Sequence, residues 1–493
     1  MLLLGIDVGT SSVKVSVVDS AMQKAIAAAQ YPDTESPITS LQPGWAEQSP
    51  EMWWKQAQKA ILRCHQTGNY NPQDIAAIGI AYQMHGLVVV DEQQNVLRDS
   101  IIWCDSRAVE IGNEAFEAIG EEKCLSHLLN SPGNFTASKL AWVKANEPEI
   151  YSRISKIMLP GDFIAMKLSG SISSSVSSLS EGIFYDFQEN RVSEDILNHF
   201  GFDENLLPRI LPVFSEHGQV SATVASQLGL KAGIPITYKA GDQPNNALSL
   251  NVLQPGEVAA TAGTSGVIYG VSDQLTYDKQ SRVNTFAHVN YTGEEKRLGV
   301  LLCINGTGSL NRWAKNLFGQ TTSYMQMNEL AQTVKPGSDG LRVLPFGNGA
   351  ERMLNNKLPG VHFQHIDLNL HTHAHIFRAV QEGIACAFRY GLDIMRENGI
   401  TPSVIRAGKA NLFLSDVFAQ CFVDVTGVPV ELYKNDGSVG AALGAGIGAG
   451  IYATPAEAFM QMHPVQLIQP SGTSMEGIYQ EWKYLLDRQL IIE

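Results

Sequence analysis

The chain has 493 residues, a formal net charge of −14 and 17% charged residues. This length exceeds what one hydrophobic core usually supports, so we expect at least two domains. The negative charge argues against a nucleic-acid partner, because no basic surface is available to neutralise backbone phosphates. Six cysteines are widely spaced and form no CxxC pair. We therefore expect reduced thiols and a cytoplasmic location.

Apolar segments predict strands and helices that alternate along the chain. In the first half, strands are expected at residues 2–7, 13–19, 75–81 and 87–91, and Ser49, Pro50 and Glu51 are typical of a helix start. In the second half, strands are expected at 236–240, 258–262, 267–271, 300–304 and 404–406, with a helix across 376–388. This alternation predicts an α/β fold with a central sheet in each half. We place the domain boundary between residues 1–241 and 242–493.

Three further segments have compositions that invite special interpretations. The serine-rich residues 169–180 are interrupted by apolar side chains, so we expect exposed strand and turn there, with a flexible linker as the alternative. Residues 438–455 carry no charge, but glycine and alanine are too weakly apolar to favour membrane insertion. A tightly packed helix is predicted instead, and no strand leads straight into its glycines as a dinucleotide fingerprint requires. The histidines at 371, 373 and 375 favour a polar helix start over a metal site.

A short turn occurs twice. Gly9-Thr10-Ser11 near the start of the chain is repeated in Gly263-Thr264-Ser265, and each copy follows an apolar strand and leads into another. The glycine allows backbone N–H groups to approach an anion, and the hydroxyls add donors. Either turn alone would be interpreted as an ordinary hairpin. The pair predicts a phosphate held between two similar halves.

Several motifs resemble the FGGY carbohydrate kinases. The opening Gly5-Ile6-Asp7-Val8-Gly9-Thr10 is similar to that of the actin, Hsp70 and sugar-kinase superfamily, and residues 44–50, 103–107, 135–140 and 378–383 carry further similarity. Gln83-Met84-His85-Gly86 resembles the xylulokinases most closely. The resemblance implies two ribonuclease H-like lobes with a cleft between them, ATP and Mg²⁺ as cofactors, and phosphorylation of D-xylulose to D-xylulose 5-phosphate.

The resemblance also implies catalytic roles. Asp242, after a predicted strand and a glycine that leaves room for substrate, matches the general base; a helix N-cap or turn aspartate is its alternative. Asp7 is assigned to Mg²⁺ through water, with a structural turn carboxylate as the alternative. The ATP phosphates are assigned to the two turns and nearby residues: Gly9, Thr10, Ser11, Lys14, Gly263, Thr264, Ser265 and Gly308. Lys14 equally suits a solvent-facing strand position.

For the sugar, the resemblance implies contacts from Gln83, Met84, His85, Trp103, Asp105 and Gln243. Pairing of Asp105 with Arg107 is an alternative for those two residues. Adenosine contacts are assigned to Gly408, Lys409 and Asn411. Two departures stand out, because Gln243 replaces the family's usual asparagine and only Gly408 remains of a triple-glycine loop.

Two other functions stay open at this stage. One is a kinase for another ketose or polyol, such as ribulose, erythritol or glycerol. The other is a non-catalytic, nucleotide-switched sugar-binding protein of the same fold. The expected partners are a sugar and ATP, with neither nucleic acid nor membrane, and a homodimer is one assembly to test.

Overall fold

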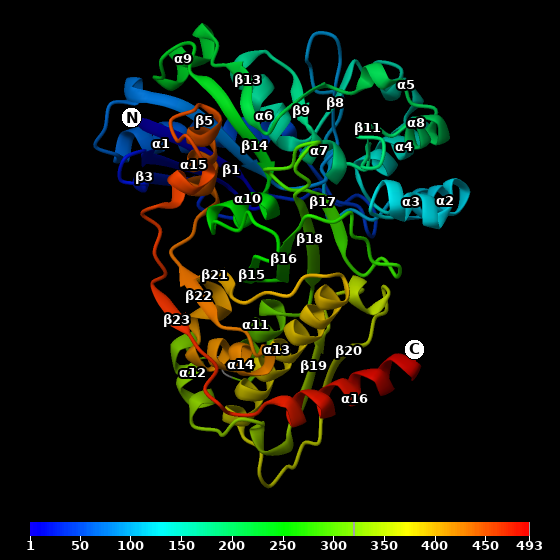
Figure 1. Cartoon of the computed structure of the whole chain (residues 1–493), viewed down its shortest axis with the longest axis vertical. Helices are drawn as coiled ribbons and strands as arrows, with labels where there is room; N and C mark the ends of the chain where they lie inside the picture. The colour runs from blue at the N-terminus through cyan, green and yellow to red at the C-terminus, as the bar shows by residue number, and fades with distance from the viewer. Residues whose placement is uncertain (319–320, 493) are drawn as a thin grey trace.

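Two mixed β-sheets organise the chain into two lobes (Figure 1). The computed structural model describes residues 1–318 and 321–492. The sheet of the N-terminal lobe runs in the spatial order β13 (Phe214–Gln219), β14 (Pro235–Gly241), β5 (Ile75–Tyr82), β1 (Leu2–Val8), β2 (Val13–Asp19) and β3 (Lys24–Tyr31). The sheet of the C-terminal lobe runs β17 (Asn284–Ala287), β18 (Leu298–Ile304), β16 (Gly266–Ser272), β15 (Val258–Ala262), β21 (Ile405–Gly408), β22 (Val430–Tyr433) and β23 (Gln466–Ile468).

The two sheets share one topology. In the first, β1, β2 and β3 form an antiparallel meander, and β5 and β14 follow parallel to β1. In the second, β15, β16 and β18 form the meander, and β21 and β22 follow parallel to β15. This repeat confirms the predicted pair of ribonuclease H-like lobes. It also explains why the two Gly-Thr-Ser turns match, since each joins the first two strands of its own sheet.

Helices cover both sheets. Those around the N-terminal sheet include α1 (Pro50–Thr67), α6 (Pro160–Ser169), α9 (Ala222–Leu228), α10 (Asp242–Ser249) and α15 (Gly437–Gly448). Those of the C-terminal lobe are α11 (Gly308–Phe318), α12 (Tyr324–Gln332), α13 (His373–Glu397), α14 (Asp416–Thr426) and α16 (Glu476–Ile492). The helix predicted at Ser49 begins at Pro50, and α13 begins at His373 with Thr372 as its N-cap, which confirms the polar helix start.

The remaining elements are short and lie mostly between β5 and β14 in sequence. They are the helices α2 (Val109–Ile119), α3 (Glu121–His127), α4 (Thr136–Asn146), α5 (Pro148–Tyr151), α7 (Val176–Glu181) and α8 (Glu194–Phe200) and the strand pairs β4 (Glu47–Gln48) with β7 (Ser100–Ile101), β6 (Val88–Val90) with β8 (Lys156–Met158), β9 (Ser173–Ser175) with β12 (Arg209–Leu211), β10 (Tyr185–Asp186) with β11 (Arg191–Val192), and β19 (Arg342–Phe346) with β20 (Gly360–Gln364).

The glycine-rich helix α15 joins the two halves of the sequence. It follows β22 in the chain, yet it packs against β1, β5 and β14 of the other lobe, as its orange ribbon shows beside them (Figure 1). A Cβ atom at Gly448 would lie 1.9 Å from the Thr237 carbonyl oxygen, and one at Gly444 would lie 2.7 Å from the Tyr238 ring. These distances confirm the tightly packed helix, because only glycine permits so close an approach. In the described ranges, no helix is long and apolar enough to cross a membrane.

The serine-rich segment differs from the prediction. Residues 173–181 form β9 and α7, and almost all of them are buried instead of exposed. Their hydroxyls find partners inside the protein: Ser175 accepts the N–H of Ser178, and Ser177 donates to the Ala287 carbonyl. A buried hydroxyl is tolerated when it is hydrogen-bonded, and composition alone does not show those partners.

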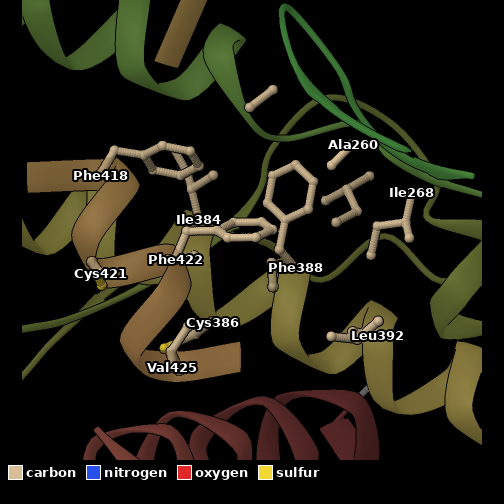
Figure 2. Close-up of a cluster of buried hydrophobic side chains, with 14 of the residues drawn as sticks. Ala260, Ile268, Ile384, Cys386, Phe388, Leu392, Phe418, Cys421, Phe422 and Val425 are labelled. Atoms are coloured by element: carbon tan, nitrogen blue, oxygen red, sulfur yellow. The ribbon is translucent and has the colours of Figure 1, made fainter. Parts of the chain in front are cut away.

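The core of the C-terminal lobe lies between its sheet and the helices α13 and α14. Figure 2 shows Phe388 of α13 beside Phe422 of α14, with Ile268 and Ala260 of the sheet on its other side. The rings of Phe388 and Phe422 meet edge to face, with centroids 5.2 Å apart. This packing fixes β15 and β16, and therefore the second Gly-Thr-Ser turn, against the long helix α13. The six cysteines are all free thiols, as predicted.

Candidate active site

Two aspartates meet at one edge of the N-terminal sheet. Asp7 lies near the end of β1, and Asp242 directly follows β14 as the first residue of α10. Both strands run parallel to β5, so their carboxyl ends lie at the same edge. Burial raises the pKa of Asp7 to about 6, with the charge of Asp436 adding to the shift. Burial and the charge of Asp7 raise the pKa of Asp242 to about 7. The two carboxyl groups are partly buried and interact electrostatically.

Asp436 is a third acid at this edge, and it was not predicted. It caps α15 by accepting the N–H of Ser438, at 2.9 Å. A Cβ atom at the next residue, Gly437, would lie 2.3 Å from Oδ2 of Asp7, so α15 begins directly against the Asp7 carboxylate. The Asp-Gly-Ser sequence before an apolar helix is a helix-start signal that could have identified Asp436 as an N-cap. Its proximity to Asp7 depends on the packing of α15 across the lobes.

The first turn connects to the segment that follows β5. The Thr10 hydroxyl donates to Oε1 of Gln83 at 3.1 Å and accepts from the Trp103 indole N–H at 2.9 Å. The backbone N–H of Gly9 donates to the Ser12 carbonyl, which closes the turn next to Ser11. The structure thus brings together three predicted residues, Thr10, Gln83 and Trp103, from three separate motifs. Gln83 is buried and its amide oxygen is already bonded to Thr10. Its amide therefore positions the first turn.

Lys14 pairs in register with Asp7 across β1 and β2. Its side chain is exposed, and its positive charge opposes the rise in the pKa of Asp7. Both of its predicted roles, phosphate ligand and solvent-facing residue, are compatible with this position.

The surroundings of His85 determine the tautomer of its imidazole ring. It has a positive φ of 62°, and its ring lies 4.8 Å from that of Phe135 and 5.5 Å from that of Phe286. Nδ1 lies 3.0 Å from the carbonyl oxygen of Glu181, which can only accept, so Nδ1 carries the proton. Burial lowers the pKa of His85 to about 3, which keeps the ring neutral. Nε2 is therefore an acceptor, suited to a sugar hydroxyl.

Met84 and Glu181 fill the space beside Gly241. A Cβ atom at Gly241 would lie 2.6 Å from Cγ of Met84 and 2.7 Å from Oε2 of Glu181. The glycine before Asp242 was predicted to leave room for substrate. The structure corrects that interpretation, because the space at Gly241 is occupied by these two side chains.

Asp105 pairs with Arg107, which was the alternative to a sugar contact. Its buried carboxylate accepts from Nε and Nη2 of Arg107 at 2.9 and 2.7 Å and from the backbone N–H of Ala46. Arg107 also stacks on the Trp45 ring, with its guanidinium carbon 3.8 Å from the centroid. A direct sugar contact by Asp105 would have to compete with these protein donors. Trp103 is 51% exposed and stands beside the first turn through its bond to Thr10.

The second turn is bonded to the start of α11. The backbone N–H groups of Gly308 and Ser309 donate to the carbonyls of Gly263 and Thr264, at 2.9 and 3.1 Å. A Cβ atom at Gly308 would lie 2.3 Å from the Gly263 carbonyl oxygen, so this contact requires glycine. Gly308 was predicted to bind the nucleotide. The structure places it against the turn that also contains Ser265.

A cavity of about 350 Å³ opens beside this turn. Its lining residues are Ala262, Gly263, Thr264, Gly308, Asn311, Arg312, Tyr324, Asn328, Asn411, Leu412, Leu414 and Ser415. Of the three residues assigned to adenosine, Asn411 lines the cavity. Gly408 ends β21 nearby, and the exposed Lys409 donates its backbone N–H to the Tyr433 carbonyl. A cavity of this size, lined by both polar and apolar side chains, can accept a nucleoside.

The remaining predicted sugar residue, Gln243, is the second residue of α10. Hydrogen bonds from its backbone and side chain to Asp242 work against the rise in the pKa of that aspartate. Gln243 therefore contacts the predicted base itself. Arg352, which was not predicted, reaches this region from the C-terminal lobe, with its guanidinium carbon 6.0 Å from the Phe135 centroid. No sequence pattern marks Arg352.

Comparisons with known proteins agree with this architecture. The profile for the N-terminal domain of the FGGY family of carbohydrate kinases matches residues 2–249, and the profile for its C-terminal domain matches residues 258–451. The chain is 30% identical over 469 residues to a xylulose kinase of Escherichia coli strain K12, covering 94% of this chain and 92% of that protein. It is 27% identical to a xylulose kinase of Bacillus subtilis strain 168 over 90% of this chain and 87% of that protein.

A solved structure is similar throughout. The crystal structure of a xylulose kinase from Rhodospirillum rubrum superimposes with a TM-score of 0.88 at 25% identity, and the match covers 99% of both chains. The similarity extends over both lobes and both Gly-Thr-Ser turns.

Proposed function

Because the chain belongs to the FGGY family of carbohydrate kinases, we propose that it transfers the γ-phosphoryl group of ATP to D-xylulose, forming D-xylulose 5-phosphate. Membership supports the reaction type and the use of ATP. The names of the similar proteins, all xylulose kinases among those compared above, support the choice of sugar. The single observation that carries the proposal is the pair Asp7 and Asp242 at one sheet edge beside the first Gly-Thr-Ser turn.

Asp242 is the proposed general base. A sugar hydroxyl loses its proton to the Asp242 carboxylate as its oxygen bonds to the γ-phosphorus, while the bond from that phosphorus to the ADP oxygen breaks. A pKa of about 7 makes Asp242 a better proton acceptor than an ordinary carboxylate, and a substantial fraction is still ionised at neutral pH. The neutral His85 accepts a hydrogen bond from another hydroxyl and orients the sugar.

The nucleotide is proposed to lie between the turns, with adenosine in the cavity beside Asn411. Mg²⁺ fits the acidic edge, because Asp7 and Asp436 would supply oxygen ligands and the buried Oδ1 of Asn245 lacks a hydrogen-bond partner among the described residues. In the described ranges, no cluster of three metal-ligating side chains is present. This arrangement suits a cation held by one or two carboxylates, waters and substrate phosphates. When bound, Mg²⁺ would offset the charge of the transferring phosphoryl group.

A kinase for ribulose, erythritol or glycerol is the second candidate. Gln243 is the reason to keep this second candidate, because the residue contacts Asp242 and replaces the family's usual asparagine. The site favours an enzyme over a non-catalytic binding protein, because carboxyl groups with a raised pKa, such as Asp242, cluster at catalytic sites.

A coupled ADP-release assay over a panel of ketoses and polyols tests the proposal. We expect D-xylulose to give the highest kcat/KM. A higher value for ribulose, erythritol or glycerol would replace the sugar and keep the reaction type. Absence of phosphorylation with every sugar, combined with measurable ATP binding, would favour the binding-protein alternative.

A further inference from the structure

Glu181 is a buried carboxyl group that the mechanism above does not use. It ends α7, and only 1% of its surface is exposed. It lies in the serine-rich segment that was predicted to be exposed, so the sequence gives no sign of its location. Burial of a carboxyl group is costly unless its oxygens have partners.

One of the two carboxyl oxygens is engaged. Oε1 accepts the backbone N–H of His85 at 3.2 Å, and the carbonyl oxygen of Glu181 bonds to Nδ1 of the same histidine. Oε2 is buried and has no hydrogen-bond partner in the part of the chain that the structure describes. Native structures rarely leave such an atom unpaired, so a ligand hydroxyl is an appropriate partner.

The free oxygen lies beside residues that are proposed to bind the sugar. It lies within 2.7 Å of the position that a Cβ atom of Gly241 would take, next to Met84 and one residue before Asp242. The charge of Asp242 acts on Glu181 directly and contributes to the rise in its pKa. Glu181 is thus bonded to His85 and interacts electrostatically with Asp242, the two residues that are proposed to contact the sugar.

The surroundings favour a protonated carboxyl group. Burial raises the pKa of Glu181 well above its usual range, and the charges of Asp242 and Asp162 add to the shift. The nearby Lys139 opposes the shift, but its ammonium group is already bonded to the carbonyls of His85 and Ile102, at 2.9 and 3.1 Å. A protonated Oε2 would act as a hydrogen-bond donor.

We propose that Glu181 is a further sugar-binding residue, whose Oε2 hydrogen-bonds one hydroxyl of the bound sugar and so determines which sugars are accepted. The inference rests on the proposed function, because it requires a sugar at the edge where Met84, His85 and Asp242 meet. A site that is built to bond a hydroxyl rejects analogues that lack it, since the buried partner is then left unpaired.

The test compares the best sugar of the wild-type enzyme with each of its single-deoxy analogues. In the wild type, the analogue that lacks the Glu181-bonded hydroxyl should lose at least about 10-fold to 100-fold in kcat/KM. In Glu181→Ala, the parent sugar should fall to nearly the value of that analogue, and the ratio of the two should approach one. The KM for ATP should stay unchanged.

Three variants separate binding from structure. Glu181→Met removes both oxygens at similar volume and carries the test if Glu181→Ala does not fold. Glu181→Gln keeps an acceptor for His85 and a donor at the free position, so it should retain the ratio within about threefold. Ser177→Ala is the matched control, because Ser177 is a buried residue of the same helix whose hydroxyl donates to the Ala287 carbonyl.

An unchanged ratio in Glu181→Ala or Glu181→Met, or an equal change in Ser177→Ala, would overturn the inference. If the wild type prefers a sugar other than D-xylulose, the proposed substrate is wrong but the same ratio is measured with that sugar. If no sugar is phosphorylated, calorimetric titration of the same sugars gives the ratio from binding constants, and absence of all sugar binding would overturn the inference.

Discussion

The two Gly-Thr-Ser turns occupy equivalent positions in two sheets of the same topology, yet their surroundings differ. The first turn lies beside the acids Asp7 and Asp436, and its Thr10 hydroxyl is bonded to Gln83 and Trp103. The carbonyls of the second turn are bonded to the start of α11, and this turn lines the cavity that contains Asn411. A duplicated scaffold has therefore acquired two environments.

This difference indicates a division of roles. Asp7 and Asp436 lie beside the first turn. Asp242 and the neutral His85 lie at the ends of the neighbouring strands β14 and β5, and Glu181 is bonded to His85. We propose that the proton and the cation are bound on this side. The second turn offers backbone groups, amides and apolar side chains, which suit a nucleoside. We therefore expect changes near the first turn to affect kcat, Mg²⁺ dependence and sugar selectivity, and changes near the second turn to affect ATP affinity.

The largest effect is expected for Asp242→Asn. The amide keeps the shape of the side chain but cannot accept the sugar proton, so kcat should fall by roughly 10²–10⁴-fold with sugar binding largely retained. Single-turnover kinetics and sugar titration measure the two quantities separately. Asp203→Asn, an exposed cap of a short helical turn, is the control. A near wild-type kcat in Asp242→Asn would show that another group accepts the proton.

The next effect concerns Asp7→Asn. A neutral amide attracts a hard cation or its water shell less strongly than a carboxylate, so the Mg²⁺ concentration for half-maximal activity should rise by about 10-fold or more. A Mg²⁺ titration at saturating ATP and sugar measures it. If the midpoint of the Mg²⁺ titration did not change, Asp7 would not be a metal ligand.

The interaction between Asp7 and Asp242 leads us to expect that kcat/KM depends on pH. Asp242 works as a base only when it is deprotonated, and its raised pKa places the acidic limb of kcat/KM near pH 7, so activity should fall as the pH drops through that value. The charge of Asp7 contributes to this rise. In Asp7→Asn the limb should therefore move to lower pH. A limb that stays near pH 7 in the variant would assign it to a group that does not interact with Asp7.

The repeated turns, many strands along the chain and the two acids Asp7 and Asp242 at strand ends could be predicted from the sequence, because apolar runs, glycines and polar residues follow one another locally. The position of Glu181 could not, since its burial depends on serine hydroxyls whose partners, such as the Ala287 carbonyl, are distant in sequence. Nor could the contact between Gly437 and Asp7, which arises when α15 crosses to the other lobe. Residues brought together by tertiary packing leave no spacing to detect.

A smaller effect is expected for Asn411→Ala at the cavity beside the second turn. Loss of one neutral hydrogen bond to the nucleoside should cost about 0.5–1.5 kcal/mol, which raises the KM for ATP by roughly 2-fold to 10-fold. The KM for the sugar should not change, since Asn411 lies with the second turn. A change in sugar KM alone would place the nucleoside elsewhere.

Removing one hydroxyl from each turn should have effects as small as that of Asn411→Ala, and these effects test the division of roles most directly. Valine keeps the shape of threonine. Thr10→Val loses the bonds to Gln83 and Trp103, so the segment leading to His85 is held less firmly and kcat/KM for the sugar should fall by roughly 2-fold to 10-fold. The fluorescence of the half-exposed Trp103 should change with it. Thr264→Val, its counterpart at the cavity, should instead raise the KM for ATP and leave sugar selectivity intact. If both variants changed the same kinetic parameter to the same extent, the two turns would share one role, and the difference in their surroundings would have no functional meaning.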